Sequence, residues 1–248
     1  MMNEGELKQR YQNSYNDRTK RALKPEHYIR LYFNYLGRLA DREISFLELG
    51  IFDGNSLEFF AGLLPKATVC GVDINECGRV FSTPRIKTYT GSQDSAALYD
   101  KILAENGMRR FDVIVDDCSH IGTLTQASFK LLFPLLAPGG LYVIEDWGTG
   151  YWPRFPGGKK LHMAGHMSVS QWIPRCLSTL WKGMPLRLKF LGERFKSHQS
   201  GIPGFLKQLA DEVGMGDAAC DHGLGTMRRT DLEYLHIYPG IAFMRKRP

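Results

Sequence analysis

Residues 46–56 read Phe46-Leu-Glu-Leu-Gly-Ile-Phe-Asp-Gly-Asn-Ser56, and this stretch decides the fold. The apolar run before Gly50 predicts a buried strand, and the amphipathic pattern after Asn55 predicts a helix. Glycine between the two lets the backbone approach a ligand where a side chain would collide. The first turn of the helix offers unpaired N–H groups to a carboxylate or a similar anion. The stretch therefore predicts a strand–turn–helix unit with a ligand at its turn.

The same alternation continues along the chain. Short apolar runs predict strands at Ile44–Leu49, Thr68–Val72, Ile86–Thr90, Phe111–Val115 and Leu141–Ile144. Amphipathic patterns between them predict helices at Ser56–Leu64, Ala96–Glu105 and Thr125–Leu136. Strands and helices in this order form an α/β fold, a doubly wound and mostly parallel sheet covered on both faces. Ligands of such sheets bind at the carboxyl ends of the strands.

The two ends of the chain differ from this central pattern. Residues 1–42 predict an N-terminal helical segment, with Tyr28, Leu31, Tyr32, Tyr35 and Leu36 forming one apolar stripe after Pro25. Residues 234–245 read as two strands that meet at Pro239-Gly240, a C-terminal antiparallel hairpin. We therefore expect a seven-stranded sheet in residues 43–248. Residues 147–200 interrupt the alternation and predict an aromatic insertion or lid beside the site.

The composition indicates one globular domain. The 248 residues contain 43% hydrophobic and 23% charged side chains, as is usual for a soluble domain. The N-terminus has no apolar leader pattern, and no run of about 18 apolar residues predicts a membrane span. The five cysteines are scattered without a CxxC pair, which favours reduced thiols over disulfides or a zinc site. We expect a cytoplasmic protein that forms a homo-oligomer, a dimer or larger.

Positive charge is concentrated in the predicted insertion. The chain carries a net charge of +6, and residues 151–200 hold nine Lys/Arg residues against one acid, Glu193. Such a segment could attract an anionic partner such as nucleic acid, a membrane face or an acidic glycan. It could equally be a solvated segment without a partner, and the charge pattern alone leaves both readings open.

The glycine turn narrows the class of ligand. A dinucleotide-binding GxGxxG is absent because residue 52 is Phe. Glu48 instead lies two residues before Gly50, and Gly54 follows, so the ExGxxxG pattern resembles motif I of the S-adenosylmethionine methyltransferases. We therefore expect S-adenosylmethionine, with its carboxylate at the start of the helix near Ser56.

Polar residues after later strands complete the predicted cofactor site. Asp73 follows the glycine turn by about 20 residues, which suits the two hydroxyls of a ribose. Gln93 and Asp94 follow the third strand, where adenine would lie, although Asp94 could also cap the next helix. The predicted cofactor-binding residues are Glu48, Gly50, Gly54, Ser56, Asp73, Gln93, Asp94 and Asp116.

Three acids end two further strands. Asp117 follows one strand, and Glu145 and Asp146 follow the next. If these strands are neighbours they lie about 4.8 Å apart, and the carboxylates would repel one another unless a cation lay between them. Oxygen ligands favour Mg²⁺ over Zn²⁺, although strand-end acids can also be satisfied by helix caps and water. His120 could accept the proton of an acceptor hydroxyl beside such an ion.

Together these motifs resemble one methyltransferase family. Asp116-Asp-Cys-Ser-His120, Pro138-Gly-Gly140 and Val143-Ile-Glu-Asp146 are similar to motifs of the metal-dependent sugar O-methyltransferases, a group that includes the mycinamicin-type and rhamnosyl enzymes and relatives grouped with cephalosporin hydroxylase. The resemblance implies Mg²⁺ ligands at Asp117, Glu145 and Asp146 and a general base at His120. Cys118 departs from the family pattern, which usually has glycine there.

We therefore expect a Mg²⁺-dependent O-methyltransferase that acts on a hydroxyl of a sugar or glycoside, with a small-molecule or glycan acceptor and no nucleic acid. Tyr151 and Trp152 could stack on a sugar face or be part of the core of the lid. The alternative acceptor is a non-sugar, such as a catechol-like small molecule or nucleic acid. A nicotinamide-dependent oxidoreductase is disfavoured by the absent GxGxxG, and a non-catalytic binding module is disfavoured by the intact acids and His120.

Overall fold

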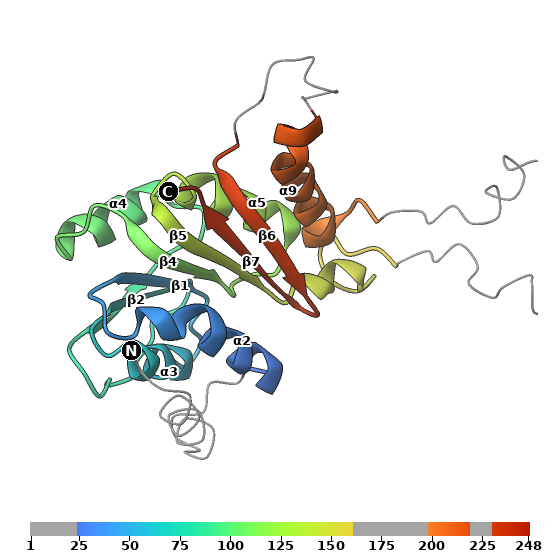
Figure 1. Cartoon of the computed structure of the whole chain (residues 1–248). Coiled ribbons are helices and arrows are strands. Elements are labelled where there is room, and N and C mark those ends of the chain that lie inside the picture. Colours follow the sequence, from blue (N-terminus) through green and yellow to red (C-terminus); the bar gives the residue numbers. More distant parts are fainter. Residues whose placement is uncertain (1–23, 161–197, 219–229) are drawn as a thin grey trace, which may run out of the picture.

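The computed structural model of this chain describes residues 24–160, 198–218 and 230–248. Seven strands form one sheet in the order β3-β2-β1-β4-β5-β7-β6 (Figure 1). The strands are β1 (Ser45–Leu49), β2 (Thr68–Asp73), β3 (Ile86–Thr90), β4 (Phe111–Asp116), β5 (Leu136–Glu145), β6 (Leu232–Tyr238) and β7 (Ile241–Lys246). The helices are α2 (Glu26–Leu36), α3 (Asn55–Leu63), α4 (Ala96–Glu105), α5 (Gly122–Leu132) and α9 (Gly201–Ala218), with short 3₁₀ turns η1 (Gly37–Leu39) and η2 (Trp147–Tyr151).

The strand order brings the ends of β1 and β4 together. Strands β1 to β5 pair in parallel, and β7 adds to β5 antiparallel and pairs with β6. The chain winds outward from β1 in one direction to β3 and in the other to β5, so the winding reverses between β1 and β4. Just past that pair, the Asp117 N–H donates to the carbonyl of Leu49 at 3.0 Å. This is the place where doubly wound sheets bind their ligands.

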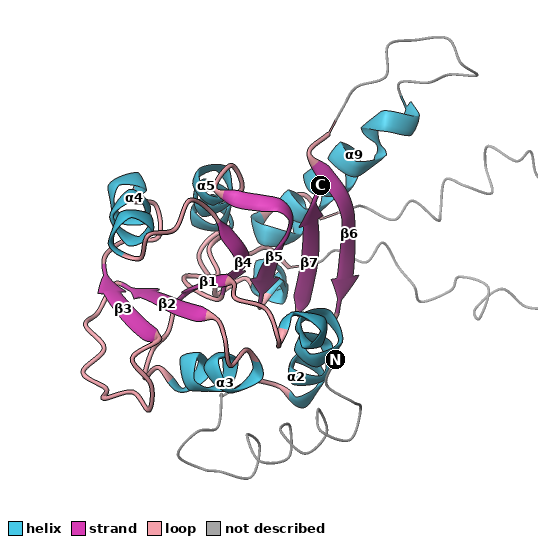
Figure 2. Cartoon of the chain, turned by 60° about the vertical axis from the view of Figure 1, so that its left-hand side comes forward, coloured by secondary structure: helices cyan, strands magenta, loops and turns pink. Residues whose placement is uncertain are grey.

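Helices cover both faces of the sheet (Figure 2). On one face α2 and α3 pack against β-strand side chains such as Leu141 and Val143. On the other face α4, α5 and α9 pack against Tyr142 and Ile144. All four of these β5 residues are buried, which is why this strand reads as a continuous apolar run rather than an alternating one.

The predicted fold class is confirmed, and the largest differences in element bounds are at the start of β5 and at the end of α5. Strand β5 begins at Leu136, five residues before the predicted start, because its pairing with β4 continues through an irregularity in register and around Gly139. The helix predicted to run to Leu136 ends at Leu132, and that prediction is wrong at its C-terminus. Pro134 lies two residues beyond this end, where a helix interior does not accommodate it.

Two predicted segments lie partly outside the described residues. Of the N-terminal helical segment, α2 and η1 are described, and residues 1–23 are not. Of the predicted insertion, residues 161–197 lie outside, whereas η2 packs against the start of α9, where Gly150 meets Pro203. The division at residue 42 stays a prediction. Within the described ranges, no helix has the length and apolar character needed to cross a bilayer.

Candidate active site

The turn after β1 is held by close backbone packing and by an acid from the next strand. Gly50 adopts φ +80°, and a Cβ there would lie 2.2 Å from the carbonyl oxygen of Asp117. Asp73, at the end of β2, accepts hydrogen bonds from the N–H groups of Ile51 and Phe52 at 3.0 Å each. Glycine is therefore required at Gly50, and the Asp73 carboxylate fixes the turn that follows.

Glu48 is fully buried beneath this turn. Ser56 Oγ donates to Glu48 Oε2 at 2.6 Å, which ties the start of α3 to β1. Glu48 Oε1 accepts no hydrogen bond, although Lys24 Nζ lies 3.2 Å away. Burial raises the pKa of Glu48 to about 7, opposed by the positive charge of Lys24. The Lys24 ammonium is therefore the charged partner of this buried oxygen.

The other predicted cofactor residues lie in different environments. Gly54 adopts φ +74° as the residue before α3. Gln93 is buried, and its side-chain amide donates to Ser128 Oγ at 2.7 Å. Asp94 is exposed, whereas burial raises the pKa of Asp116 to about 7. The cofactor roles of these residues stay predictions.

Three predicted site residues form an outer group, defined as Asp117, His120 and Asp146. One ligand atom of each lies within 4.8 Å of the others. His120 Nε2 is 3.9 Å from an oxygen of Asp117 and 3.9 Å from an oxygen of Asp146. Tyr28 on α2 donates to the other Asp146 oxygen at 2.8 Å. The outer group has the composition and spacing of a site for a divalent cation.

Glu145 does not join the outer group. Its Oε1 accepts from Lys24 Nζ at 2.7 Å and from Tyr32 Oη at 2.5 Å. Lys24, Glu48 and Glu145 are all buried and form an inner group behind Asp117. Burial raises the pKa of Glu145, and the nearby charge of Asp117 raises it further. The structure thus differs from the arrangement that the sequence indicated, and the ligand role of Glu145 stays a prediction.

The backbone of the site is strained. Among the described non-glycine residues, positive φ occurs at Phe52 (46°), His120 (52°) and Asp146 (50°). Such conformations cost on the order of 1–3 kcal/mol each and persist where the surrounding structure enforces them. Phe52 lies in the glycine turn and the other two belong to the outer group, so all three lie at the carboxyl edge of the sheet.

The two predicted substrate aromatics have different surroundings. The ring of Tyr151 lies 5.8 Å from that of Trp147 and 4.8 Å from that of His198, which ties η2 to the segment before α9. Trp152 is 59% exposed. Phe155, which the sequence did not single out, lies 6.4 Å from the His120 ring. Tyr151 therefore belongs to packed structure, whereas Trp152 is free to meet a ligand.

Sequence reasoning missed three α2-side residues that contact the acids. Lys24 precedes α2, and Tyr28 and Tyr32 lie one helical turn apart on it. The sequence pattern places these tyrosines in an apolar stripe, but each hydroxyl donates to a carboxylate. Tyrosine in place of an aliphatic residue was the available signal, because a buried phenol needs a hydrogen-bond partner.

A pocket of about 210 Å³ opens where α5 begins, directly after His120 in the chain. The side chains of Gln126, Gln199 and Gln208 line it. Gln126 Nε2 donates to Gln208 Oε1 at 3.2 Å, and Ile121 and Phe205 also line the pocket, so its lining combines polar and apolar groups.

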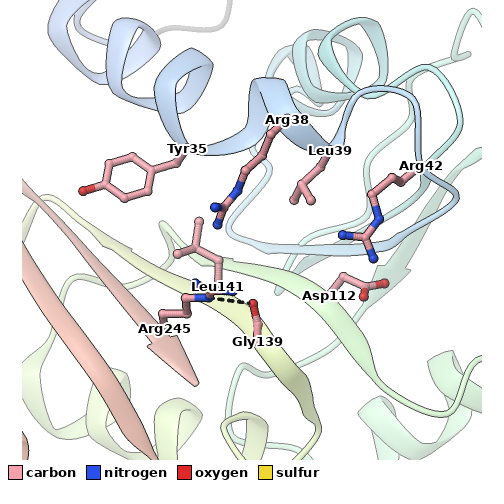
Figure 3. Close-up of a pocket in the computed structure, with 8 residues that line it drawn as sticks. All are labelled: Tyr35, Arg38, Leu39, Arg42, Asp112, Gly139, Leu141 and Arg245. Atoms are coloured by element: carbon pink, nitrogen blue, oxygen red, sulfur yellow. Dashed lines mark hydrogen bonds between the residues drawn. The ribbon is translucent and has the colours of Figure 1, made fainter. Parts of the chain in front are cut away.

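A second pocket lies at the opposite edge of the sheet. It measures about 190 Å³ and holds Arg38, Arg42 and Arg245 together with Asp112, near the start of β4 (Figure 3). Arg245 donates from Nε to the carbonyl of Gly139 at 3.2 Å. None of the predicted site residues lines either pocket, but the pocket at α5 adjoins His120 in the chain, so we place the candidate active site at the carboxyl edge.

Comparisons with known proteins agree with this geometry. No family model matches the chain. It is 37% identical over 138 residues to mycinamicin VI 2''-O-methyltransferase of Micromonospora griseorubida, covering 53% of this chain and 33% of that protein. It is 34% identical over 158 residues to demethylmacrocin O-methyltransferase of Streptomyces fradiae, covering 57% and 38%. The chain thus spans about a third of the length of these curated relatives.

A solved structure extends the similarity over almost all of the chain. MycE methyltransferase from the mycinamycin biosynthetic pathway, in complex with Mg and SAH, matches with a TM-score of 0.66 and 25% identity. The match covers 97% of this chain and 54% of that one. These findings confirm the resemblance to the sugar O-methyltransferases that the motifs indicated.

Proposed function

We propose that this chain transfers a methyl group from S-adenosylmethionine to a hydroxyl of a sugar or glycoside, with Mg²⁺ at the outer group. The observation that carries the proposal is the position of the outer group. Asp117 touches the Gly50 turn through its backbone, so the predicted cofactor turn and the predicted metal ligands share one edge of the sheet.

The outer group fits Mg²⁺. This ion prefers oxygen ligands and is often held by one or two carboxylates together with water or substrate. Asp117 and Asp146 offer two carboxylates, which leaves the His120 nitrogen uncoordinated. When bound, the ion would lower the pKa of an acceptor hydroxyl nearby. Oε1 of Glu145, the third predicted ligand, would have to leave Lys24 to join them.

His120 is the proposed general base. Its Nε2 lies 3.9 Å from an oxygen of Asp117 and 3.9 Å from an oxygen of Asp146, so an acceptor hydroxyl beside these carboxylates would be within reach of the imidazole. Thr149 Oγ1 donates to the His120 carbonyl at 3.0 Å and holds its backbone in place. A base so placed would take the hydroxyl proton at Nε2 while the acceptor oxygen is alkylated.

The turn after β1 is the proposed cofactor site. S-adenosylmethionine would supply the methyl group, and Gly50 would let it lie against the backbone. Glu48 and Ser56 would face its methionine end, and Asp73 its ribose. Gln93, Asp94 and Asp116 are proposed around the adenine, and Gly54 at the start of α3.

The proposed acceptor is a sugar because the relatives of this chain include enzymes named for methylating glycosides, such as a rhamnosyl-tetracenomycin. Trp152 is exposed near the carboxyl edge of the sheet and could stack on a sugar face. Tyr151, the residue before it, would hold η2 in place through its packing. No role for nucleic acid is proposed. A homo-oligomer and a cytoplasmic location stay proposals, and light scattering of the purified chain would test the first.

The test is turnover with a panel of glycosides, S-adenosylmethionine and Mg²⁺, followed by mass spectrometry for products that gain one methylene group. We expect a methylated product that disappears with EDTA. His120→Ala should lower kcat by about 100- to 10,000-fold, as for other general bases. His236→Ala, on β6 and bonded to Tyr35, is the matched control and should keep activity. Turnover that survives both EDTA and His120→Ala would refute the proposed site.

A further inference from the structure

The ammonium group of Lys24 lies among carboxylates from three neighbouring strands. Its Nζ is 2.7 Å from Asp117 Oδ2, 2.7 Å from Glu145 Oε1 and 3.2 Å from Glu48 Oε1. Glu48 belongs to β1, Asp117 directly follows β4, and Glu145 ends β5. The acids that would attract a divalent ion already surround a positive charge that belongs to the chain itself.

This arrangement is enclosed. The Lys24 side chain is 4% exposed, and those of Glu48 and Glu145 are 0% and 2% exposed. The ring of Phe60 lies 5.8 Å from Nζ, and Tyr32 donates to the same Glu145 oxygen that Lys24 contacts. A buried ammonium is stable only when it is paired, and a buried carboxylate has the same requirement. Lys24 and its partners therefore hold one another in place.

Asp117 lies between the inner group and the rest of the outer group. One of its oxygens contacts Lys24, and the other faces His120, while Asp146 lies further out with 48% of its side chain exposed. An ion bound to Asp117 and Asp146 would leave the Lys24 contacts intact. An ion bound to Glu145 Oε1 would have to take the oxygen that Lys24 and Tyr32 already occupy.

We propose that Lys24 is a built-in cation of the inner group, a positioning residue that occupies Glu145 Oε1 and confines a divalent ion to Asp117 and Asp146. The proposal rests on the divalent site of the proposed function and goes beyond it by assigning the carboxylates of the inner group to the lysine. Lys24 and a divalent ion compete for Glu145, because two positive charges so close together repel.

The test is Mn²⁺ binding, measured by the loss of the free-ion EPR signal, in the full chain with S-adenosylhomocysteine present. Lys24→Met removes the charge and keeps most of the side-chain length. We expect Mn²⁺ affinity to rise by about tenfold or more, because three carboxylates lose their cation. Lys101→Met removes an exposed lysine that pairs with Glu105 and should leave the affinity unchanged.

Glu145→Gln supplies the second arm and decides the question even if Lys24→Met does not fold. With Lys24 present, we expect Glu145→Gln to change Mn²⁺ affinity by less than about threefold, because Glu145 is not a ligand. In the Lys24→Met background the same change should abolish the gain. A loss of about 30-fold or more from Glu145→Gln alone, or an unchanged affinity in Lys24→Met, would overturn the proposal.

Two further outcomes separate this inference from the proposed function. Tight Mn²⁺ binding to Lys24→Met together with none to the unaltered chain would support the competition while removing the divalent ion from the proposed reaction. Binding to neither protein would overturn both.

Discussion

Replacing Gly50 with alanine tests how tightly the strand ends are packed at the site. A Cβ at this position would lie 2.2 Å from the Asp117 carbonyl oxygen, 2.6 Å from Cys118 Cα and 2.8 Å from the Asp117 carbonyl carbon. All three atoms belong to the backbone, so no side-chain rotation relieves the contact. The end of β4 would have to move away from β1, and Asp117 would move with it.

The structure supplies a matched control for this change. Gly107 also has positive φ, +63°, but a Cβ there would meet nothing within 4 Å. Alanine at Gly107 should therefore lower the free energy of unfolding by about 1–2 kcal/mol, the conformational term alone. Alanine at Gly50 adds a backbone clash of about 1–3 kcal/mol, as in other overpacked sites.

Urea unfolding followed by circular dichroism measures both free energies. We expect Gly50→Ala to be the less stable variant by about 1–3 kcal/mol, and to lose affinity for S-adenosylhomocysteine in calorimetry while Gly107→Ala keeps it. If the two variants unfold within about 0.5 kcal/mol of each other, the close approach of β1 and β4 described above is refuted.

Two further substitutions test contacts that support the site and the fold. Tyr32→Phe removes a donor to Glu145 and should lower the free energy of unfolding by about 1.5–3 kcal/mol. Tyr35→Phe, at a less buried tyrosine, should lower it by about 1 kcal/mol or less. Equal losses in the two variants would refute the stronger contribution of the hydrogen bond from Tyr32 to Glu145. Arg85→Met removes the guanidinium that donates to carbonyls at and beyond the end of α3, such as Ala67 O at 2.7 Å. It should lower the free energy of unfolding by about 1–2 kcal/mol, and an unchanged urea midpoint would refute this role.

Much of the fold could be predicted because its signals are local. The strand and helix of residues 46–56 follow from the apolar run and from the glycine between them, and β1 and α3 begin within one residue of the predicted positions. The start of β5 could not be predicted in the same way. Leu136 pairs with Phe111, and that pairing depends on a register irregularity that only the neighbouring strand determines.

The same distinction between local sequence signals and long-range contacts applies to the candidate site. Asp117, His120 and Asp146 could be placed together because each follows a strand whose end is visible in the sequence. Lys24 reaches Asp117 across 93 residues and Glu145 across 121, and no local pattern connects such positions. The partner of Glu145 was therefore beyond the reach of sequence reasoning.

Gln93 illustrates a second kind of limit. Its spacing after β3 predicts a polar side chain near adenine, a role that stays a prediction, and its amide donates to Ser128 on α5, a contact that the spacing does not indicate. A single polar residue can satisfy a ligand or the protein interior, and the choice depends on which neighbour the tertiary fold supplies. A glycine turn is a more specific signal than a polar residue, because a position with positive φ disfavours nearly every side chain.

Anomalous diffraction from a crystal grown with Mn²⁺ and S-adenosylhomocysteine tests the central claim most directly. We predict one strong manganese peak within about 2.5 Å of carboxylate oxygens of both Asp117 and Asp146, with His120 Nε2 beside it and Lys24 still on Glu145. Absence of a peak between Asp117 and Asp146 under these conditions would contradict a divalent cation site at the carboxyl edge of the sheet.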